Sequence, residues 1–146
     1  MNSKVEQFLT AKEEKNIIDA IRTAEELTSG ELRVHIESNS TGNIDARTID
    51  VFETLQMHQT AERNGVLIYI AVIDKAFAIY GDDGINRKVD LNFWNSTKDI
   101  MQNHFKAGQF AEGLIQGILK AGQELSRFFP RLDSDVNELS NTISKG

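Results

Sequence analysis

Two adjacent carboxylates between two glycines form the most informative short segment of the chain. The segment is Gly81-Asp82-Asp83-Gly84, and it follows a run of strand-forming residues. Like charges side by side repel each other, while glycine permits the sharp backbone that folds oxygen atoms around a cation. A hard divalent cation would relieve that repulsion. Asp and Gly are also common turn residues, so the residue types alone favour the simpler interpretation, an acidic surface turn.

Other chemistries find little support in the residues. The motifs GxGxxG, GxxxxGK[ST], GxSxG and HExxH are absent. The lack of cysteine excludes thiol nucleophiles and cysteine-ligated metals. His35, His58 and His104 lie in three separate predicted elements, and we interpret them as surface or packing residues. The net charge of -6 opposes binding to nucleic acid, because phosphate backbones are also negative. No residue is assigned a catalytic role by these patterns.

The elements that must position the two aspartates follow from the hydrophobic pattern. Helical periodicity with capping residues predicts helices, and alternating or continuous short apolar runs predict strands. The predicted helices span residues 10–27, 44–59, 91–106 and 110–129, with a turn or short helix at 85–89, and the predicted strands span 31–37, 66–73 and 76–81. This order predicts an α/β fold in which helices pack on a small mixed sheet.

The two later strands should form a hairpin around the polar pair Asp74-Lys75. If Ile73 pairs with Ala76, then Leu67 faces Asp82 across the hairpin. The first strand should run parallel to the second through a right-handed helical crossover. The third strand then runs antiparallel to both.

This topology brings oxygen-bearing side chains to one edge of the sheet. The first strand starts at Glu31, the second starts after Asn64, and the third ends before Asp82 and Asp83. Three carboxylates and an amide supply the hard oxygen ligands that Ca²⁺ and Mg²⁺ prefer. We therefore expect these four residues to converge on a Ca²⁺ or Mg²⁺ site, with Asp90 as an outside candidate.

Two other places offer cation ligands and rank lower. The carboxyl ends of parallel strands often bind ligands, and residues 38–43 and Asp74 lie at that opposite edge, which carries fewer charges. The segment Asp133–Asn137 copies the first five positions of an EF-hand loop. It lacks the glycine at position six and the glutamate at position twelve, so it ranks third.

Neither export nor membrane insertion is predicted. The first ten residues lack the apolar stretch of a signal peptide, and the longest apolar run, residues 66–73, is far shorter than the roughly 20 residues that span a bilayer. We expect a cytoplasmic protein that does not insert into membranes. A chain of 146 residues suits one domain. We place it at residues 1–130 and expect a polar C-terminal arm at residues 131–146.

Several segments in a fixed order resemble the TPM domain, a family named for thylakoid lumen, photosystem II repair and acetylcholine-receptor-modulator proteins. These segments are Ser29-Gly30-Glu31, the run RNGVLIYIAVIDKAFAIYGDDGIN from Arg63, Phe93-Trp94, and FKAGQFAEGLIQGI at residues 105–118. The similarity covers about residues 8–130, and the tail DVNELSN is similar to that of a short bacterial subgroup.

The resemblance implies a three-layer α/β/α sandwich with a small mixed sheet. It also implies divalent-cation binding in some members and acid phosphatase activity in a plant member. Matched position by position, the residues carried over are Glu31, Asn64, Asp82 and Asp83, which coincide with the edge cluster.

The function expected from these arguments is a soluble TPM domain that binds Ca²⁺ or Mg²⁺ and acts as a binding or assembly module, with a protein as a further partner. The alternative is a metal-dependent acid phosphatase that uses the same site, and a simple interaction adaptor ranks third. The nearby basic residues Arg63, Arg87 and Lys88 are interpreted as solvent-facing charges, and no histidine is expected beside the carboxylates. We therefore expect at most slow phosphatase turnover.

Overall fold

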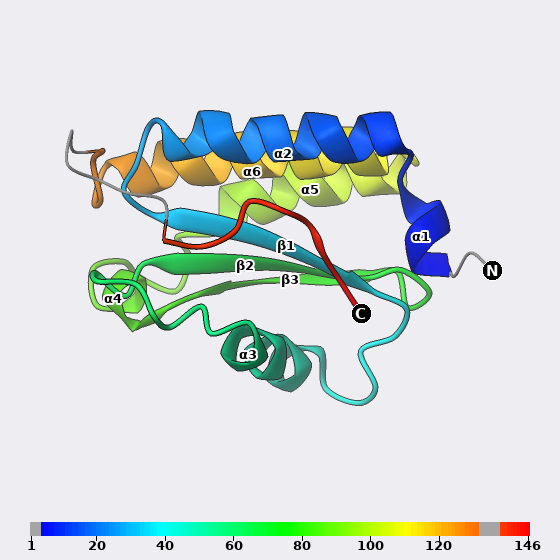
Figure 1. The fold of residues 1–146 in the computed structure, drawn as a ribbon, viewed down its shortest axis with the longest axis horizontal. Coiled ribbons are helices and arrows are strands. Elements are labelled where there is room, and N and C mark those ends of the chain that lie inside the picture. The colour runs from blue at the N-terminus through cyan, green and yellow to red at the C-terminus, as the bar shows by residue number, and fades with distance from the viewer. Residues whose placement is uncertain (1–3, 132–137) are drawn as a thin grey trace.

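The computed structural model describes residues 4–131 and 138–146. Within these residues the chain forms a mixed four-stranded sheet in the order β3-β2-β1-β4, with helices on both faces (Figure 1). The strands are β1 (Glu31–Glu37), β2 (Gly65–Ala71), β3 (Ala76–Gly81) and β4 (Ser144–Lys145). The helices are α1 (Lys4–Phe8), α2 (Ala11–Glu25), α3 (Ile44–Thr54), α4 (Asp83–Asn86), α5 (Asn95–Lys106) and α6 (Phe110–Ser126).

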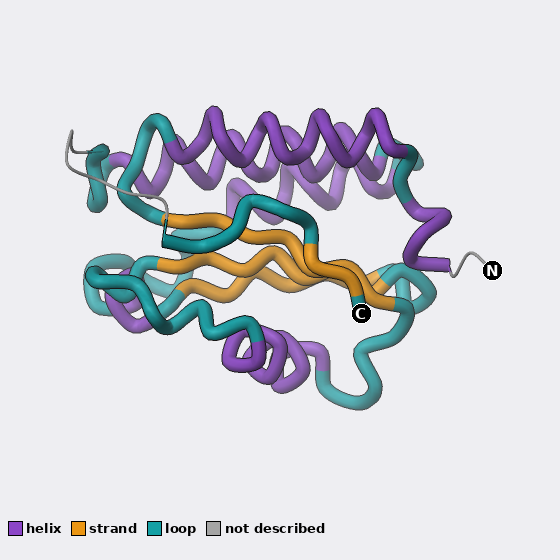
Figure 2. Tube along the Cα trace, viewed as in Figure 1, coloured by secondary structure: helices purple, strands orange, loops and turns teal. Residues whose placement is uncertain are grey.

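The elements form three layers. Helices α2, α5 and α6 lie on one face of the sheet, and α3 covers the opposite face (Figures 1 and 2). Strands β1 and β2 are parallel and are joined through α3, while β3 is antiparallel to β2. The chain is thus a three-layer α/β/α sandwich with a small mixed sheet, which confirms the predicted fold class.

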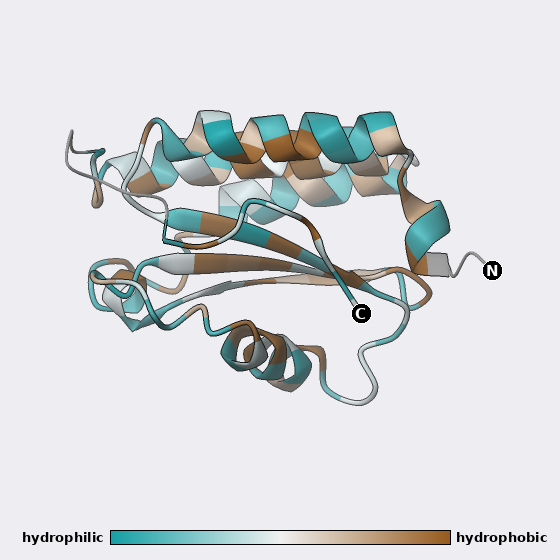
Figure 3. Cartoon of the chain, viewed as in Figure 1, coloured by the Kyte–Doolittle hydropathy of each residue, from teal (hydrophilic) through white to brown (hydrophobic). Residues whose placement is uncertain are grey.

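The alternation of side chains along β1 explains why helices cover both faces. Leu32, Val34 and Ile36 are buried in a core with residues of α2 and α6. The side chains between them point to the α3 face, where Arg47 of α3 binds Glu37. Strand β2 is buried along its whole length, and Figure 3 shows that it is almost continuously apolar. A strand between two helical layers needs apolar residues on both faces.

Helix α2 begins at the predicted capping box. Thr10 Oγ1 accepts a hydrogen bond from the backbone N–H of Glu13 at 3.1 Å, and Glu13 Oε1 accepts one from the backbone N–H of Thr10 at 2.8 Å. Each side chain satisfies a donor that the first helical turn leaves free. Ile17 and Ile21, one turn apart, are then fully buried against the core.

Helix α6 lies against both α2 and α5, and glycines permit the close contacts. A Cβ at Gly122 would lie 2.8 Å from the Cβ of Ala24 in α2, and a Cβ at Gly117 would lie 2.7 Å from the Sδ of Met101 in α5. Real Cβ atoms essentially never approach other atoms so closely. The glycines of α6 therefore serve helix–helix packing.

The β2–β3 hairpin has a different register from the predicted one. Ala71 pairs with Ala76 and Leu67 pairs with Tyr80, so the connection is two residues longer than expected. The reason is that the backbone N–H groups of residues 72 and 73 donate to the carbonyl oxygens of residues 37 and 38, at 2.9 Å each. A shift of two residues keeps every side chain on its predicted face.

The segment 138–146 adds a strand that the sequence analysis did not predict. Strand β4 pairs in parallel with β1, with Ser144 opposite His35 and Lys145 opposite Ile36. Figure 1 shows this segment running beside β1. Two residues carry no readable periodicity, which explains why only a polar arm was expected. The EF-hand-like segment Asp133–Asn137 lies outside the described residues.

Candidate functional site

A hollow of about 450 Å³ opens on the α3 face, at the end of the sheet where β2 begins and β3 ends. Helix α3 carries the chain back from the end of β1 to the start of β2, so its C-terminal end lies at this edge. The residues that line the hollow are Ile49, Phe52, Glu53, His58, Arg63, Tyr80, Asp82 and Asp83. Two of the four predicted ligands are therefore part of it.

Asp82 is buried at the junction between β3 and α4. Its backbone N–H donates to the carbonyl oxygen of Gly65 at 3.0 Å, which extends the pairing of β3 with β2 by one residue. Its side-chain Oδ1 accepts a hydrogen bond from the backbone N–H of Asp83 at 2.8 Å, as an N-terminal capping residue does. The residue is only 1% exposed, so its carboxylate needs a partner.

Arg63 is that partner. Its Nε donates to Asp82 Oδ2 at 2.7 Å, and its Nη2 donates to Asp82 Oδ1 at 2.8 Å. Arg63 has a φ of 51°, in the left-handed region that non-glycine residues rarely adopt. The carbonyl oxygen of Arg63 accepts a hydrogen bond from the backbone N–H of Gly84 at 2.8 Å, and a Cβ on Gly84 would lie 2.6 Å from that oxygen. The interpretation of Arg63 as a solvent-facing charge was therefore wrong.

Asp83 is the exposed member of the pair. Its side chain is 54% exposed, and its Oδ2 lies 3.7 Å from Arg63 Nη2. Glu53 from the end of α3 and His58 from the following loop line the same hollow. The expectation that no histidine lies beside the carboxylates was therefore wrong. The crossover topology, which brings the end of α3 to this edge, was the signal that could have identified both residues.

Glu31 lies at the same edge but is kept apart from Asp82. Glu31 pairs with Gly65, and Gly65 in turn binds the backbone of Asp82, so the two acidic residues are two strand spacings apart, about 9 to 10 Å. Gly65 has no side chain between them, and a Cβ there would lie 2.9 Å from the carbonyl oxygen of Met57. The backbone at Met57 thus covers the space between Glu31 and Asp82.

Asn64 holds loops together. Its side-chain Nδ2 donates to Ser29 Oγ at 3.3 Å and to Glu62 Oε2 at 3.4 Å, while its backbone N–H donates to Thr60 Oγ1 at 3.1 Å. Its carbonyl oxygen accepts the backbone N–H of Glu31 at 3.3 Å. The structure thus brings Asp82 and Asp83 together, while Asn64 belongs to a supporting loop and Glu31, at the start of β1, stays apart from the two aspartates.

Burial dominates the electrostatics of Glu31. The residue is 3% exposed, its Oε1 accepts the backbone N–H of Leu139 at 2.6 Å, and its Oε2 has no hydrogen-bond partner among the described residues. Burial raises the pKa of Glu31 to about 7, although the hydrogen bond from Leu139 opposes the shift. Burial likewise raises the pKa of neighbouring Glu25, whose Oε2 accepts the backbone N–H of Leu32, to about 7. Both carboxyls titrate near neutral pH.

The opposite edge of the sheet contains a second polar cluster. Glu37 accepts hydrogen bonds from Arg47 at 2.8 and 2.9 Å and from the hydroxyl of Tyr69, and it is linked to His35 Nε2 at 2.9 Å. Burial would raise the pKa of Glu37, but these hydrogen bonds outweigh it and lower the pKa to about 2. Because the carboxylate is fully committed to protein partners, we interpret this cluster as structural.

Asp74 lies at the opposite edge of the sheet, which ranked second as a cation site. It binds the loop that follows β1. Its Oδ2 accepts hydrogen bonds from Ser40 N–H at 2.8 Å and Ser40 Oγ at 3.0 Å, and its Oδ1 accepts one from Asn39 Nδ2 at 3.1 Å. These bonds lower the pKa of Asp74. Its oxygens stabilise the connection between residues 38–43 and the hairpin, and so they are poorly available to a cation.

The described residues offer a divalent cation few ligands. Across residues 4–131 and 138–146, no group of three or more His, Asp or Glu side chains is close enough to hold a metal ion. Asp83 offers an exposed hard carboxylate, and Asp82 adds a second one whose oxygens Arg63 already binds; this donor set is compatible only with a cation, such as Mg²⁺, that keeps most of its water ligands. Asp90 takes part in an exposed turn, where its Oδ1 accepts the N–H of Asn92 at 2.9 Å.

The other two basic candidates do not line the hollow. Arg87 is exposed at the end of α4, and Lys88 Nζ lies 4.4 Å from the ring centroid of Phe129. Arg63 is therefore the only arginine or lysine among the residues that line it.

Comparison with known proteins agrees with this architecture. The fold and the acidic hollow define a three-layer α/β/α domain with a polar site at one end of its sheet. A family model for the TPM domain matches residues 3–124. The chain therefore belongs to the TPM-domain family, as its sequence segments indicated.

Several solved structures match the chain, among them the following two. The NMR structure of the BA42 protein from the psychrophilic bacterium Bizionia argentinensis shares 54% identity with a TM-score of 0.93, covering 99% of this chain and 100% of that one. The solution NMR structure of the N-terminal domain of a P. gingivalis protein shares 21% identity with a TM-score of 0.65, covering 84% of this chain and 79% of that one. No curated protein sequence matches the chain. Among the described residues, no helix combines the length and the apolar composition that a bilayer span requires.

Proposed function

We propose that this TPM domain binds Mg²⁺ or Ca²⁺ at the hollow through Asp82 and Asp83, and that it acts as a binding or assembly module. The observation that carries the proposal is the exposed carboxylate of Asp83 next to the buried carboxylate of Asp82, at the rim of the hollow that Glu53 also lines. Water would complete the coordination, as it usually does for Mg²⁺ in proteins.

The charge balance of the hollow supports a divalent cation. Three carboxylates, from Glu53, Asp82 and Asp83, share the hollow with one guanidinium, that of Arg63. The excess negative charge favours a cation. Arg63 already occupies both oxygens of Asp82, so the cation would approach from the exposed Asp83 side and compete with Arg63 for Asp82. This competition predicts modest affinity.

In this proposal Glu31 and Asn64 contribute indirectly. Asn64 fixes the loop that ends in Arg63, and Glu31 lies beyond the backbone of Met57. The negative charge of Glu31 still adds to the local field when it is ionised, which its pKa of about 7 makes partial at neutral pH.

Titration with MgCl₂ and with CaCl₂, followed by amide NMR of the whole chain, tests the proposal. We expect shifts confined to residues 62–64 and 82–86. Replacing Asp83 by Asn should weaken binding about tenfold or more, because one of two charged ligands is lost. The matched control is Asp99→Asn, an exposed acidic residue on α5 outside the hollow. Unchanged affinity in Asp83→Asn, or shifts elsewhere only, would contradict the assignment.

A second candidate is slow, metal-dependent hydrolysis of phosphate monoesters in the same hollow. The observation that favours it is the presence of Arg63 and His58 beside the aspartates, since a guanidinium can bind phosphate and an imidazole can transfer a proton. Hydrolysis of p-nitrophenyl phosphate from pH 4 to 8, with and without Mg²⁺, tests it. Turnover that Asp83→Asn abolishes and Asp99→Asn leaves intact would establish an enzyme.

A further inference from the structure

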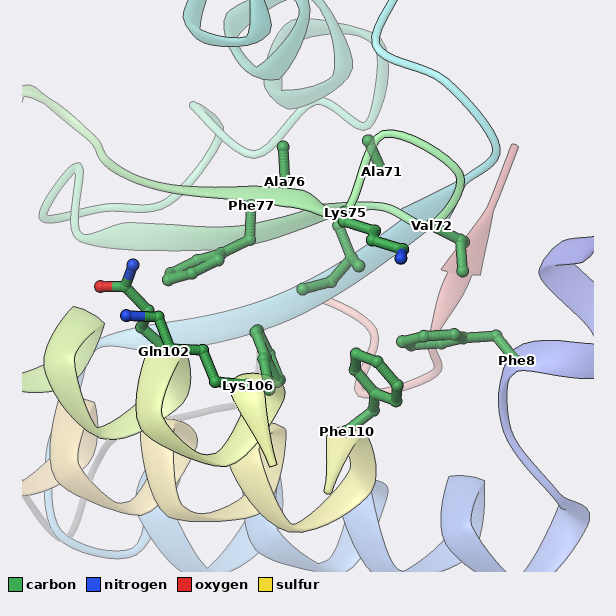
Figure 4. A pocket seen from close by; sticks show the side chains of 11 residues that line it. Phe8, Ala71, Val72, Lys75, Ala76, Phe77, Gln102, Lys106 and Phe110 are labelled. Atoms are coloured by element: carbon green, nitrogen blue, oxygen red, sulfur yellow. The ribbon is translucent and has the colours of Figure 1, made fainter. Parts of the chain in front are cut away.

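A second, largely apolar pocket lies at the other end of the sheet, between the β2–β3 hairpin and the junction of α5 with α6 (Figure 4). Its volume of about 390 Å³ is within the range of small-molecule sites. Ile70 and Ala71 of β2, both buried, form part of its lining. The pocket shares no residue with the acidic hollow.

Four phenylalanine rings in successive contact form the apolar wall. The ring centroids are 5.1 Å apart for Phe8 and Phe110, 5.7 Å for Phe110 and Phe105, and 5.2 Å for Phe105 and Phe77. These rings are only partly buried, and Phe110 remains 37% exposed. Figure 4 shows Phe8, Phe77 and Phe110 around the opening. A ligand with an apolar body would bury this surface and make stacked or edge-on contacts with the rings.

The charged groups that line the pocket are positive and favour a negatively charged ligand. Lys75 and Lys106 line it, and no acidic residue does, although the chain as a whole carries a net charge of -6. Among the described residues, neither lysine takes part in an ion pair. Two unpaired ammonium groups at an apolar opening are complementary to an anion.

Gln102 provides a further donor beside Lys106. The two residues are four positions apart on α5, so their side chains lie on the same face of the helix. An amide N–H and an ammonium at this spacing can together donate to the two oxygens of one carboxylate. The start of α6 at Phe110, where no side chain caps the helix, adds a partial positive charge on the same side of the pocket.

We propose that this pocket binds a small free carboxylate with an aromatic or aliphatic body. The body occupies the space between the phenylalanine rings and β2, and the carboxylate binds Lys106 and Gln102 with Lys75 as a second cation. This site is independent of the cation site proposed above, and each can fail without the other.

The direct test is titration of the full chain with naphthalene-2-carboxylate, followed by amide NMR. We expect shifts at residues 70–77, 102–106 and 110, and none at residues 82–86. Naphthalene-2-methanol is the neutral probe of matched shape. It should bind about tenfold more weakly, because it cannot form the charged hydrogen bonds.

Two kinds of variant separate charge from shape. The double substitution Lys75→Gln with Lys106→Gln should weaken binding of the carboxylate about tenfold and leave binding of the alcohol unchanged. Lys98→Gln, at an exposed position of α5 outside the pocket, is the matched control and should change neither. Val72→Trp, at a pocket-lining position whose side chain points towards Phe8 in Figure 4, should fill the opening and abolish binding of both probes while the spectrum of the acidic hollow stays native.

Three results would overturn the proposal. The first is equal affinity for the carboxylate and the alcohol, since the pocket would then lack charge selection. The second is that shifts fall outside the named residues. The third is sedimentation with phosphatidylglycerol vesicles in the absence of any binding of the free carboxylate, because the surface would then recognise a membrane.

Discussion

Arg47 on α3 and Glu37 at the end of β1 form the same two-point ion pair that Arg63 and Asp82 form at the opposite end of the sheet. The distances from Arg47 Nε and Nη2 to the carboxylate oxygens are 2.8 and 2.9 Å. In each pair the carboxylate side chain is almost fully buried, at 7% and 2% exposed, while the guanidinium side chain is 40% and 42% exposed. The first pair fastens α3 to one end of the sheet, and the second fastens the loop that follows α3 to the other end.

The first of these pairs predicts a loss of stability in acid. Glu37 has a pKa of about 2 in the folded chain against 4.5 ordinarily, so it stabilises the fold above pH 4.5 and loses that contribution as pH falls towards 2. Glu37→Gln should lower the free energy of unfolding at pH 7 by on the order of 2 to 3 kcal/mol. The difference from the parent chain should vanish near pH 2. Urea unfolding across this range measures it, and a constant difference would contradict the prediction.

Glu31 predicts the opposite dependence on pH. Its folded pKa of about 7 lies above the ordinary 4.5, so its contribution to stability is complete below pH 4.5 and is lost as pH rises through 7. Glu31→Gln should therefore be more stable than the parent chain at pH 8, by on the order of 1 to 3 kcal/mol, and equal to it near pH 4. Thermal unfolding at the two pH values checks this. A Glu31→Gln chain that is less stable at pH 8 would show that the ionised form is favoured by a partner.

Arg63 combines an ion pair with a left-handed backbone, and two substitutions separate these effects. Both Arg63→Ala and Arg63→Gly leave the buried Asp82 without its partner, which should cost about 2 to 3 kcal/mol. Alanine at a φ of 51° should cost about 1 kcal/mol more than glycine, because only alanine has a Cβ that opposes this conformation. Chemical unfolding of both variants gives the comparison. Equal stability would mean that the loop relaxes to a negative φ.

The contact between α6 and α2 should be intolerant of a single added methyl group. A Cβ at Gly122 would meet the Cβ of Ala24 at 2.8 Å and its carbonyl oxygen at 3.1 Å, and backbone atoms cannot move away easily. Gly122→Ala should destabilise the chain by about 1 to 3 kcal/mol despite the better helix propensity of alanine. Gly117→Ala should cost less, because the flexible side chain of Met101 can move. The reverse order in thermal unfolding would contradict this packing.

The sequence was a reliable guide to the α/β/α layers because they depend on patterns that extend over many residues. The alternation in β1, the continuous apolar run of β2 and the capping box at Thr10 each identify an element without knowledge of its neighbours. Such patterns could not predict the register of the hairpin, because the register depends on hydrogen bonds from residues 72 and 73 to residues 37 and 38 at the end of β1. Strand β4 was missed because its pairing partner lies more than a hundred residues earlier in the chain.

For the candidate site, topology correctly placed Glu31, Asn64, Asp82 and Asp83 at one edge of the sheet. Topology could not show which of these side chains lie close together and which are separated by a loop. The covering of Gly65 by the backbone of Met57 depends on the path of an irregular loop, which periodicity does not describe. Whether a cation binds there stays a prediction.

The segment 138–146 also covers the edge of β1, which would otherwise be open to pairing with other molecules. It lies along the outer side of β1, where Leu139 N–H binds Glu31, strand β4 pairs with the second half of β1, and the N–H of Gly146 binds the carbonyl oxygen of Ile36 at 2.8 Å. Without this cover, a seven-residue strand rich in Leu, Val and Ile would be an open edge, ready to pair with the same strand of another molecule. The short, polar β4 therefore protects the chain from edge-to-edge aggregation.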